Sequence, residues 1–337
     1  MVANASNARY EKHRRRRNPG KIDGVVTGSG KKADLPGALR GDFTRLAAFE
    51  RDLADLAAFE TAGAELRMRM EAAQRALGSV QDDTKAFAGD LMNAPIGQAL
   101  GLDVLADDAR GRFEATVSRL NTTIAGRTIF AGIATNGPAL APAEDMLATL
   151  EALVSAAPDP ASAETAVRDW FAPGGGFDTA GYLGDTTPVP DQPVGPGVRL
   201  GLSVTAEDAA IRGTLAALAV AAFSGTGPMA GSPSAQQARL VNAGVALQSA
   251  QTELSDLRGR IGAGEARLDE VATRNAAETS ALEIARSALT DVDIYDKATE
   301  LEAVQGQLDL LYVITARSAR LSLLSVLCGP TPHAGPP

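Results

Sequence analysis

The amino-acid sequence predicts a mainly α-helical protein, built as a long antiparallel helical rod or coiled-coil bundle with a small α+β insert. Three observations lead to this prediction: a seven-residue apolar repeat in the C-terminal third, amphipathic segments toward both ends, and a Gly/Pro-rich middle. An apolar residue at every seventh position forms a thin stripe along a helix, and such a stripe is buried against other helices. A chain with this layout fits a bundle whose middle is an insertion at its far end.

The clearest element is a helix over about residues 235–292, which carries an a/d heptad pattern from 240 to 292. A helix over the heptad region alone spans about 80 Å, more than a compact core needs. The a positions hold large aliphatic residues in every heptad except one, where Asn275 interrupts the series. We expect these aliphatic residues to form the seam of the rod: Leu240, Leu247, Leu254, Ile261, Leu268, Leu282 and Leu289.

Two amphipathic segments earlier in the chain are the expected partners of this helix. Helical periodicity begins near Asp42 and predicts a helix over about 42–89, with a shift of register near Phe59. A second segment, about 103–130, carries apolar residues on one face. Together these segments predict a helical rod domain formed by residues 42–132 and 235–292.

Residues 133–234 have a different composition and are expected to form a small α+β insert domain. The run Gly174–Gly176 lacks the following Lys-Ser/Thr of a phosphate-binding loop, so a flexible loop is favoured there. Thr205 and Asp208 resemble a capping arrangement at the start of a helix. The expected elements are helices over 143–156, 161–171 and 206–223, and a strand over 198–204.

Residues 293–327 are expected to form a C-terminal assembly helix. The acidic residues just before it suit the first turn of a new helix. The two ends of the chain, 1–41 and 328–337, lack helical periodicity, so we expect a basic disordered segment at one end and a Pro-rich disordered tail at the other. The apolar residues predicted to contact other subunits are Leu301, Val304, Leu308, Leu311, Ile314, Leu321 and Leu324.

The charge distribution argues against nucleic-acid binding by the folded part. The whole chain has a net charge of -9, but residues 1–32 hold nine basic and two acidic residues, so the remainder is strongly acidic. The basic run Lys12–Arg17 is either a solvated tail, which charge patterning favours, or a contact with an anionic surface. No apolar run approaches the ~18–20 residues of a membrane span, and no secretory signal is recognisable.

No catalytic site, cofactor or metal is expected. The only histidines, His13 and His333, lie in the terminal segments, and Cys328 is the single cysteine. This excludes a Ser/His/Asp or Cys/His site in the body and an intrachain disulfide. Paired carboxylates such as Asp82 and Asp83 are typical of the solvated face of an acidic helix.

Two stretches resemble the flagellin family. Leu120–Gly132 contains an Asn followed by Gly-Arg-x-x-Phe-x-Gly, and Ala285–Asp293 resembles the family signature where the rod passes into the terminal helix. In the first stretch we expect Gly126 to allow close helix approach, Phe130 to anchor a turn and Gly132 to end the helix. These three residues would then shape the tip of the rod.

Within that family, the short insert and the stretch Ala38–Phe43 look more like the alphaproteobacterial protein at the hook–filament junction than like flagellin. The resemblance implies a structural subunit of the bacterial flagellum, exported unfolded without a cleaved signal and assembled outside the cell as a ring. The implied partners are further copies of the chain, the hook-side junction protein, flagellin, an export chaperone and the export apparatus, with no nucleic acid and no membrane. The ends differ from the family, because 1–33 show no amphipathic helix and 328–337 are Pro-rich.

Three alternatives stay open. Flagellin itself is the nearest, since it shares the same helical ends. A cytosolic coiled-coil adaptor accounts for the heptads equally well. An enzyme is the weakest alternative, because the chain offers no convergent polar constellation on a loop-rich scaffold.

Overall fold

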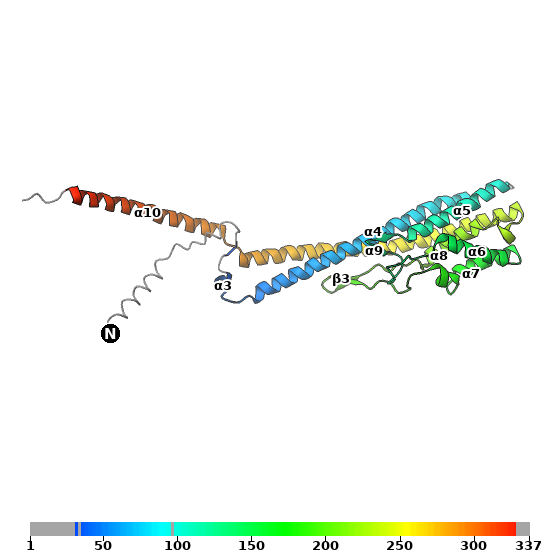
Figure 1. Ribbon diagram of the computed structural model, residues 1–337, viewed down its shortest axis with the longest axis horizontal. Helices are drawn as coiled ribbons and strands as arrows, with labels where there is room; N and C mark the ends of the chain where they lie inside the picture. Colours follow the sequence, from blue (N-terminus) through cyan, green and yellow to red (C-terminus); the bar gives the residue numbers. More distant parts are fainter. Residues whose placement is uncertain (1–30, 33–34, 96–97, 328–337) are drawn as a thin grey trace, which may run out of the picture. The chain divides into compact units, whose positions relative to one another are not determined.

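The computed structural model describes residues 31–32, 35–95 and 98–327, and it confirms a mainly helical fold (Figure 1). The chain divides into two units, Met1–Leu53 with Ser280–Pro337 (unit 1) and Ala54–Thr279 (unit 2). The two longest helices, α4 (Thr44–Met92) and α9 (Pro233–Thr290), run through both units. None of the helices in the described ranges is both long and apolar enough to cross a lipid bilayer.

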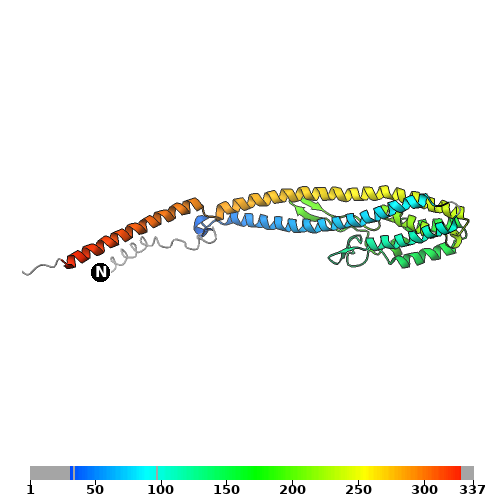
Figure 2. The same cartoon turned by 90° about the horizontal axis from the view of Figure 1, so that it is seen from above.

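In unit 2, α4 and α9 lie side by side as an antiparallel pair (Figure 2), and two hydrogen bonds define their register. The Gln74 side chain on α4 donates to the backbone oxygen of Arg258 on α9 at 2.9 Å. One heptad further along α4, Gln81 donates to the backbone oxygen of Gln251, one heptad back along α9, at 3.3 Å. Equal steps in opposite directions mean that the two helices keep the same relative alignment over this stretch.

Apolar burial along the pair follows the heptads. The a-position residues from Leu240 to Leu268 are buried against α4 side chains such as Leu66, Met70 and Leu77. Burying a side chain of this size stabilises the fold by about 1.5–3 kcal/mol. The helix pair is therefore held by a long apolar seam, although its glycines lower helix propensity.

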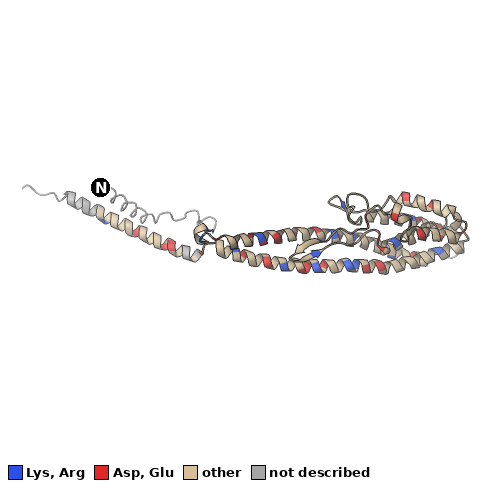
Figure 3. Ribbon diagram, turned by 90° about the horizontal axis from the view of Figure 1, so that it is seen from below, with Lys and Arg blue, Asp and Glu red and all other residues tan. Residues whose placement is uncertain are grey.

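Charged residues of both signs are spread along the two long helices (Figure 3). Some form ion pairs between α4 and α9, such as Arg67 with Asp269. Others pair within one helix, such as Arg274 with Glu270. Exposed pairs of this kind contribute at most about 1 kcal/mol each, so the seam dominates the stability of the rod.

Helix α5 (Ala99–Leu120) turns back from the end of α4 and packs along α8 (Ala209–Ala222). Arg119, in the last turn of α5, binds the Asp83 carboxylate of α4 at 3.0 Å. The expectation of one helix over 103–130 is wrong at its C-terminal end. After Leu120 the chain forms a short antiparallel hairpin, β1 (Thr123–Ile124) and β2 (Arg127–Thr128).

The insert contains both helices and strands, as the sequence predicts. An aromatic cluster of Phe113, Trp170, Phe171 and Phe177 joins it to α5, with rings mostly edge to face. The expected strand over 198–204 is shorter in the structure, and the helix expected from 206 begins later. The observed elements are α6 (Ala143–Ala156), α7 (Pro160–Phe171), the π-helix η1 (Phe177–Gly181), β3 (Gln192–Gly195), β4 (Val198–Leu200), α8 and the 3-10 helix η2 (Gly227–Met229).

One apolar core links the insert to the rod. It includes Leu77 and Phe87 from α4, Phe113 from α5, Leu150 from α6 and Leu247 from α9. Residues 54–279 accordingly form one compact unit. The insert thus shares its hydrophobic core with the helices that carry it.

A buried arginine ties α8 to the segment before it. Arg212 forms ion pairs with Asp178 and Glu207, and its guanidinium lies 5.0 Å from the centre of the Phe177 ring. Burial acts to raise the pKa of the Asp178 carboxyl, but the Gly174 N–H and the Arg212 guanidinium outweigh it and hold that pKa below its usual value. The charged form of Asp178 therefore stabilises the folded state.

This arrangement predicts a loss of stability in acid. Because the pKa of Asp178 is lowered by folding, its contribution is full above the ordinary carboxyl pKa of 3.8 and is lost as the pH falls through the folded value. We expect the melting temperature to fall more steeply below about pH 4 in the wild type than in Asp178→Asn, whose amide does not titrate. Circular dichroism melts between pH 6 and pH 2 would measure this, and equal acid sensitivity in both proteins would contradict it.

Unit 1 contains the helix α3 (Leu35–Ala38), the ends of α4 and α9, and α10 (Ile294–Leu327). Lys31 forms an antiparallel β-bridge with Asp291. Lys32 donates to the backbone oxygens of Leu289 and Thr290 at the end of α9. The expectation of disorder over 1–41 is therefore wrong for residues 31–32 and for the segment that contains α3. The basic run Lys12–Arg17 and the tail 328–337 lie outside the described residues.

Candidate assembly surface

Helix α10 presents large apolar side chains to solvent. Leu301, Leu308, Leu311 and Ile314 are each about half exposed, and Val304 is half-buried. The backbone of α10 extends past Leu321 and Leu324, but their side chains lie outside the described part of the chain. The predicted contact residues with described side chains are thus accessible to another molecule.

Further exposed apolar residues of α10 were not among the predicted contact residues: Tyr295, Leu310, Tyr312 and Val313. Five consecutive apolar residues, 310–314, occupy all sides of a helix, because each residue turns by about 100°. A helix that is apolar all round is typically buried among several neighbours. The run is uninterrupted in the sequence, but a spacing of three and four residues selects a single stripe and leaves part of it out.

The seam residues fall into two groups. Leu240, Leu247, Leu254, Ile261 and Leu268 are buried, whereas Leu282 and Leu289 are half-buried. The interrupting Asn275 is also buried, with 6% of its surface exposed. The seam residues are therefore buried over most of unit 2 and partly exposed toward the end of α9.

The three residues assigned to the rod tip lie elsewhere. The end of α4 and the start of α5 form the turn, whereas Gly126, Phe130 and Gly132 follow the far end of α5. Gly126 occupies the β1–β2 turn with φ +75, and a side chain there would meet open space, so it allows no close helix approach. Phe130 is fully buried, and Gly132 lies against the segment 185–187 instead of ending a helix.

Asn121 shows why the helix stops before this loop. Its side-chain nitrogen donates to the backbone oxygen of Leu140 at 3.0 Å, and its oxygen accepts from the Leu140 N–H at 2.8 Å. This two-way bond fixes the loop against the start of the insert. Sequence reasoning gave Asn121 no such role, because its partner lies 19 residues away.

Asn121→Ala is expected to destabilise unit 2 by about 1–3 kcal/mol, since it leaves two backbone groups of Leu140 without their partner. Asn121→Asp keeps the acceptor for the Leu140 N–H but sets a carboxylate oxygen against the Leu140 oxygen, so it should not restore the lost stability. Urea unfolding followed by circular dichroism would measure both. Equal stability of wild type and Asn121→Ala would show that this bond does not hold the loop.

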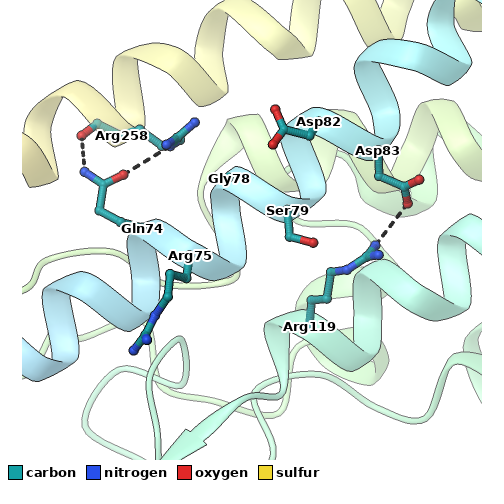
Figure 4. Close-up of a pocket in the computed structure, with 8 residues that line it drawn as sticks. All are labelled: Gln74, Arg75, Gly78, Ser79, Asp82, Asp83, Arg119 and Arg258. Carbon is teal, nitrogen blue, oxygen red and sulfur yellow. Dashed lines mark hydrogen bonds and ion pairs between the residues drawn. The ribbon is translucent and has the colours of Figure 1, made fainter.

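A polar hollow of about 650 Å³ lies over Gly78 on α4 (Figure 4). Arg258 on its wall binds the side-chain oxygens of Gln74 and Gln81, and Arg119 binds Asp83. Arg119 thus links α5 to α4, and Arg258 links α9 to α4. This arrangement suits a structural contact between α4, α5 and α9.

A long apolar seam between two helices and a helix with exposed apolar residues are typical of structural proteins that associate through helix packing. The comparison with protein families agrees, because residues 245–327 match the model of the bacterial flagellin C-terminal helical region. This match covers most of α9 and all of α10. No curated protein matches the chain.

Residues 245–327 are therefore similar to the C-terminal helical region of bacterial flagellin, the structural protein of the flagellum. Proteins of this family are structural and not enzymes.

Proposed function

We propose that this chain is the subunit that joins the hook of the flagellum to its filament, a junction protein of the hook-associated protein 3 type. The observation that carries the assembly part is the exposed apolar surface of α10 within the matched flagellin region. The small insert and the Ala38–Phe43 stretch favour a junction subunit over a filament subunit.

In this proposal each stretch of the chain has its own structural role. Residues 42–132 and 235–292 form the rod, 133–234 form the insert, and 293–327 form the assembly helix. The seam residues from Leu240 to Leu289 hold the rod, and the apolar residues of α10 contact neighbouring subunits. Further copies of the chain, the hook-side junction protein and flagellin are the partners in the assembly, and an export chaperone and the export apparatus deliver it without a cleaved signal.

Complementation tests this proposal. Deletion of the gene should yield cells that complete hooks and release intact flagellin into the medium, and the wild-type gene should restore attached filaments. A deletion strain that makes no flagellin would instead assign the chain to the filament, the second candidate, which the family match itself supports. Absence of the protein from the medium of hook-complete cells would favour a cytosolic coiled-coil adaptor.

A further inference from the structure

The hairpin of β3 and β4 contacts both long helices in unit 2. Gln192, the first residue of β3, donates through its side-chain nitrogen to the backbone oxygen of Ala62 on α4 at 3.0 Å. Asn275 on α9 donates through its side-chain nitrogen to the backbone oxygen of Val194 at 2.8 Å. One short strand is thus hydrogen-bonded to α4 and to α9.

The strand lies directly on α9. A Cβ atom placed on Gly195 would come within 2.7 Å of Val271 Cγ1 and 3.2 Å of Asn275 Oδ1. Val194 beside it is buried, with 1% of its surface exposed. Because only glycine permits this approach, the backbone of the hairpin is the surface that α9 contacts here.

Asn275 is out of place for a helix pair alone. It occupies the heptad position that holds leucine or isoleucine elsewhere, and its Oδ1 is buried without a hydrogen-bond partner in the described part of the chain. An amide in an apolar seam weakens helix packing relative to an aliphatic residue. The contact that accounts for this residue is its bond to the hairpin.

The hairpin also lies where the closed seam ends. Leu268 and Val271 are buried just before Asn275, whereas Leu282 and Leu289 after it are half-buried. Unit 2 ends at Thr279, about one helical turn beyond Asn275.

We propose that the β3–β4 hairpin is a clasp that stops the separation of α4 and α9 from spreading past Ala62 and Asn275. The helix ends beyond the clasp open and repack while the body of unit 2 stays closed. This goes beyond the junction role, since the clasp acts in the isolated chain whatever the chain assembles with.

Hydrogen exchange on the full-length monomer tests the clasp with Gln192→Ala, which leaves the apolar seam intact. Amides of 62–70 and 264–275 should exchange about fivefold faster, the effect of one net hydrogen bond, while those of 80–91 and 240–254 stay unchanged. Unchanged exchange near the clasp, or an equal rise along the whole pair, would overturn the proposal.

Asn275→Leu gives an independent readout, because it completes the apolar seam and removes only the bond to Val194. We expect faster exchange in Gln192–Leu200 without a fall in melting temperature. Gln251→Ala is the matched control, since it removes an amide bond to Thr84 within the closed seam and should leave the hairpin unchanged. A hairpin that keeps its full protection in Asn275→Leu would overturn the proposal.

Discussion

Replacing Leu308 and Leu311 together with aspartate is expected to leave the monomer folded and to abolish its assembly. Both side chains are already about half exposed in the monomer, at 48% and 57%, so little apolar contact is lost on substitution. In an assembled interface each carboxylate would be buried without a partner, which weakens association by about a thousandfold or more. Sedimentation velocity of the purified protein and the attachment of filaments in complemented cells would measure the two effects.

Leu100→Asp is the control for this experiment. Leu100 is more exposed than either α10 leucine, at 84%, but it lies at the start of α5 in unit 2. It should leave assembly intact. If Leu100→Asp abolished association while the α10 double variant did not, the contact surface would lie on the α4–α5 turn.

Gly132→Ala is expected to destabilise unit 2 by about 2–5 kcal/mol, through backbone strain and overpacking. Gly132 has φ +57, where a side chain is strained. Its Cβ would also collide with the backbone oxygens of Asp185 and Thr187. This segment bonds to the loop through Asp185 N–H to Ala131 and Ile133 N–H to Thr187, so it cannot move away freely.

Gly126→Ala separates the two causes, because Gly126 also has a positive φ but faces open space. It should lose only the strain of about 1–2 kcal/mol. Denaturant unfolding of both variants gives the difference, which measures the contact with 185–187. Equal losses in the two variants would mean that the contact is absorbed by a small local shift.

The long helices were predictable because a heptad repeat reports the face that a helix buries, wherever its partner lies in the chain. The C-terminal end of α5 could not be predicted in this way. Ile124 continues the apolar face of the helix, so periodicity carried the prediction past Leu120. What ends the helix is the bond of Asn121 to Leu140 and the positive φ of Ala125 and Gly126, which periodicity does not report.

The assembly surface and the hairpin contact were also predictable only in part. The exposed apolar residues of α10 stand in a pattern that sequence reasoning could use, although the run 310–314 shows that more than one side needs a neighbour. Asn275 only broke a pattern, and its partner Val194 lies 81 residues earlier. A role that depends on so distant a backbone oxygen becomes visible only when the fold is known.

The matched steps of Gln74 and Gln81 against Arg258 and Gln251 couple the lengths of α4 and α9. Removing one heptad from α4 alone would shift every later contact between α4 and α9 out of register. Removing one heptad from each helix at facing positions would shorten the helix pair by about 10 Å and keep the remaining contacts in register. Related chains of different length should therefore show paired insertions or deletions in these two helices, always in whole heptads.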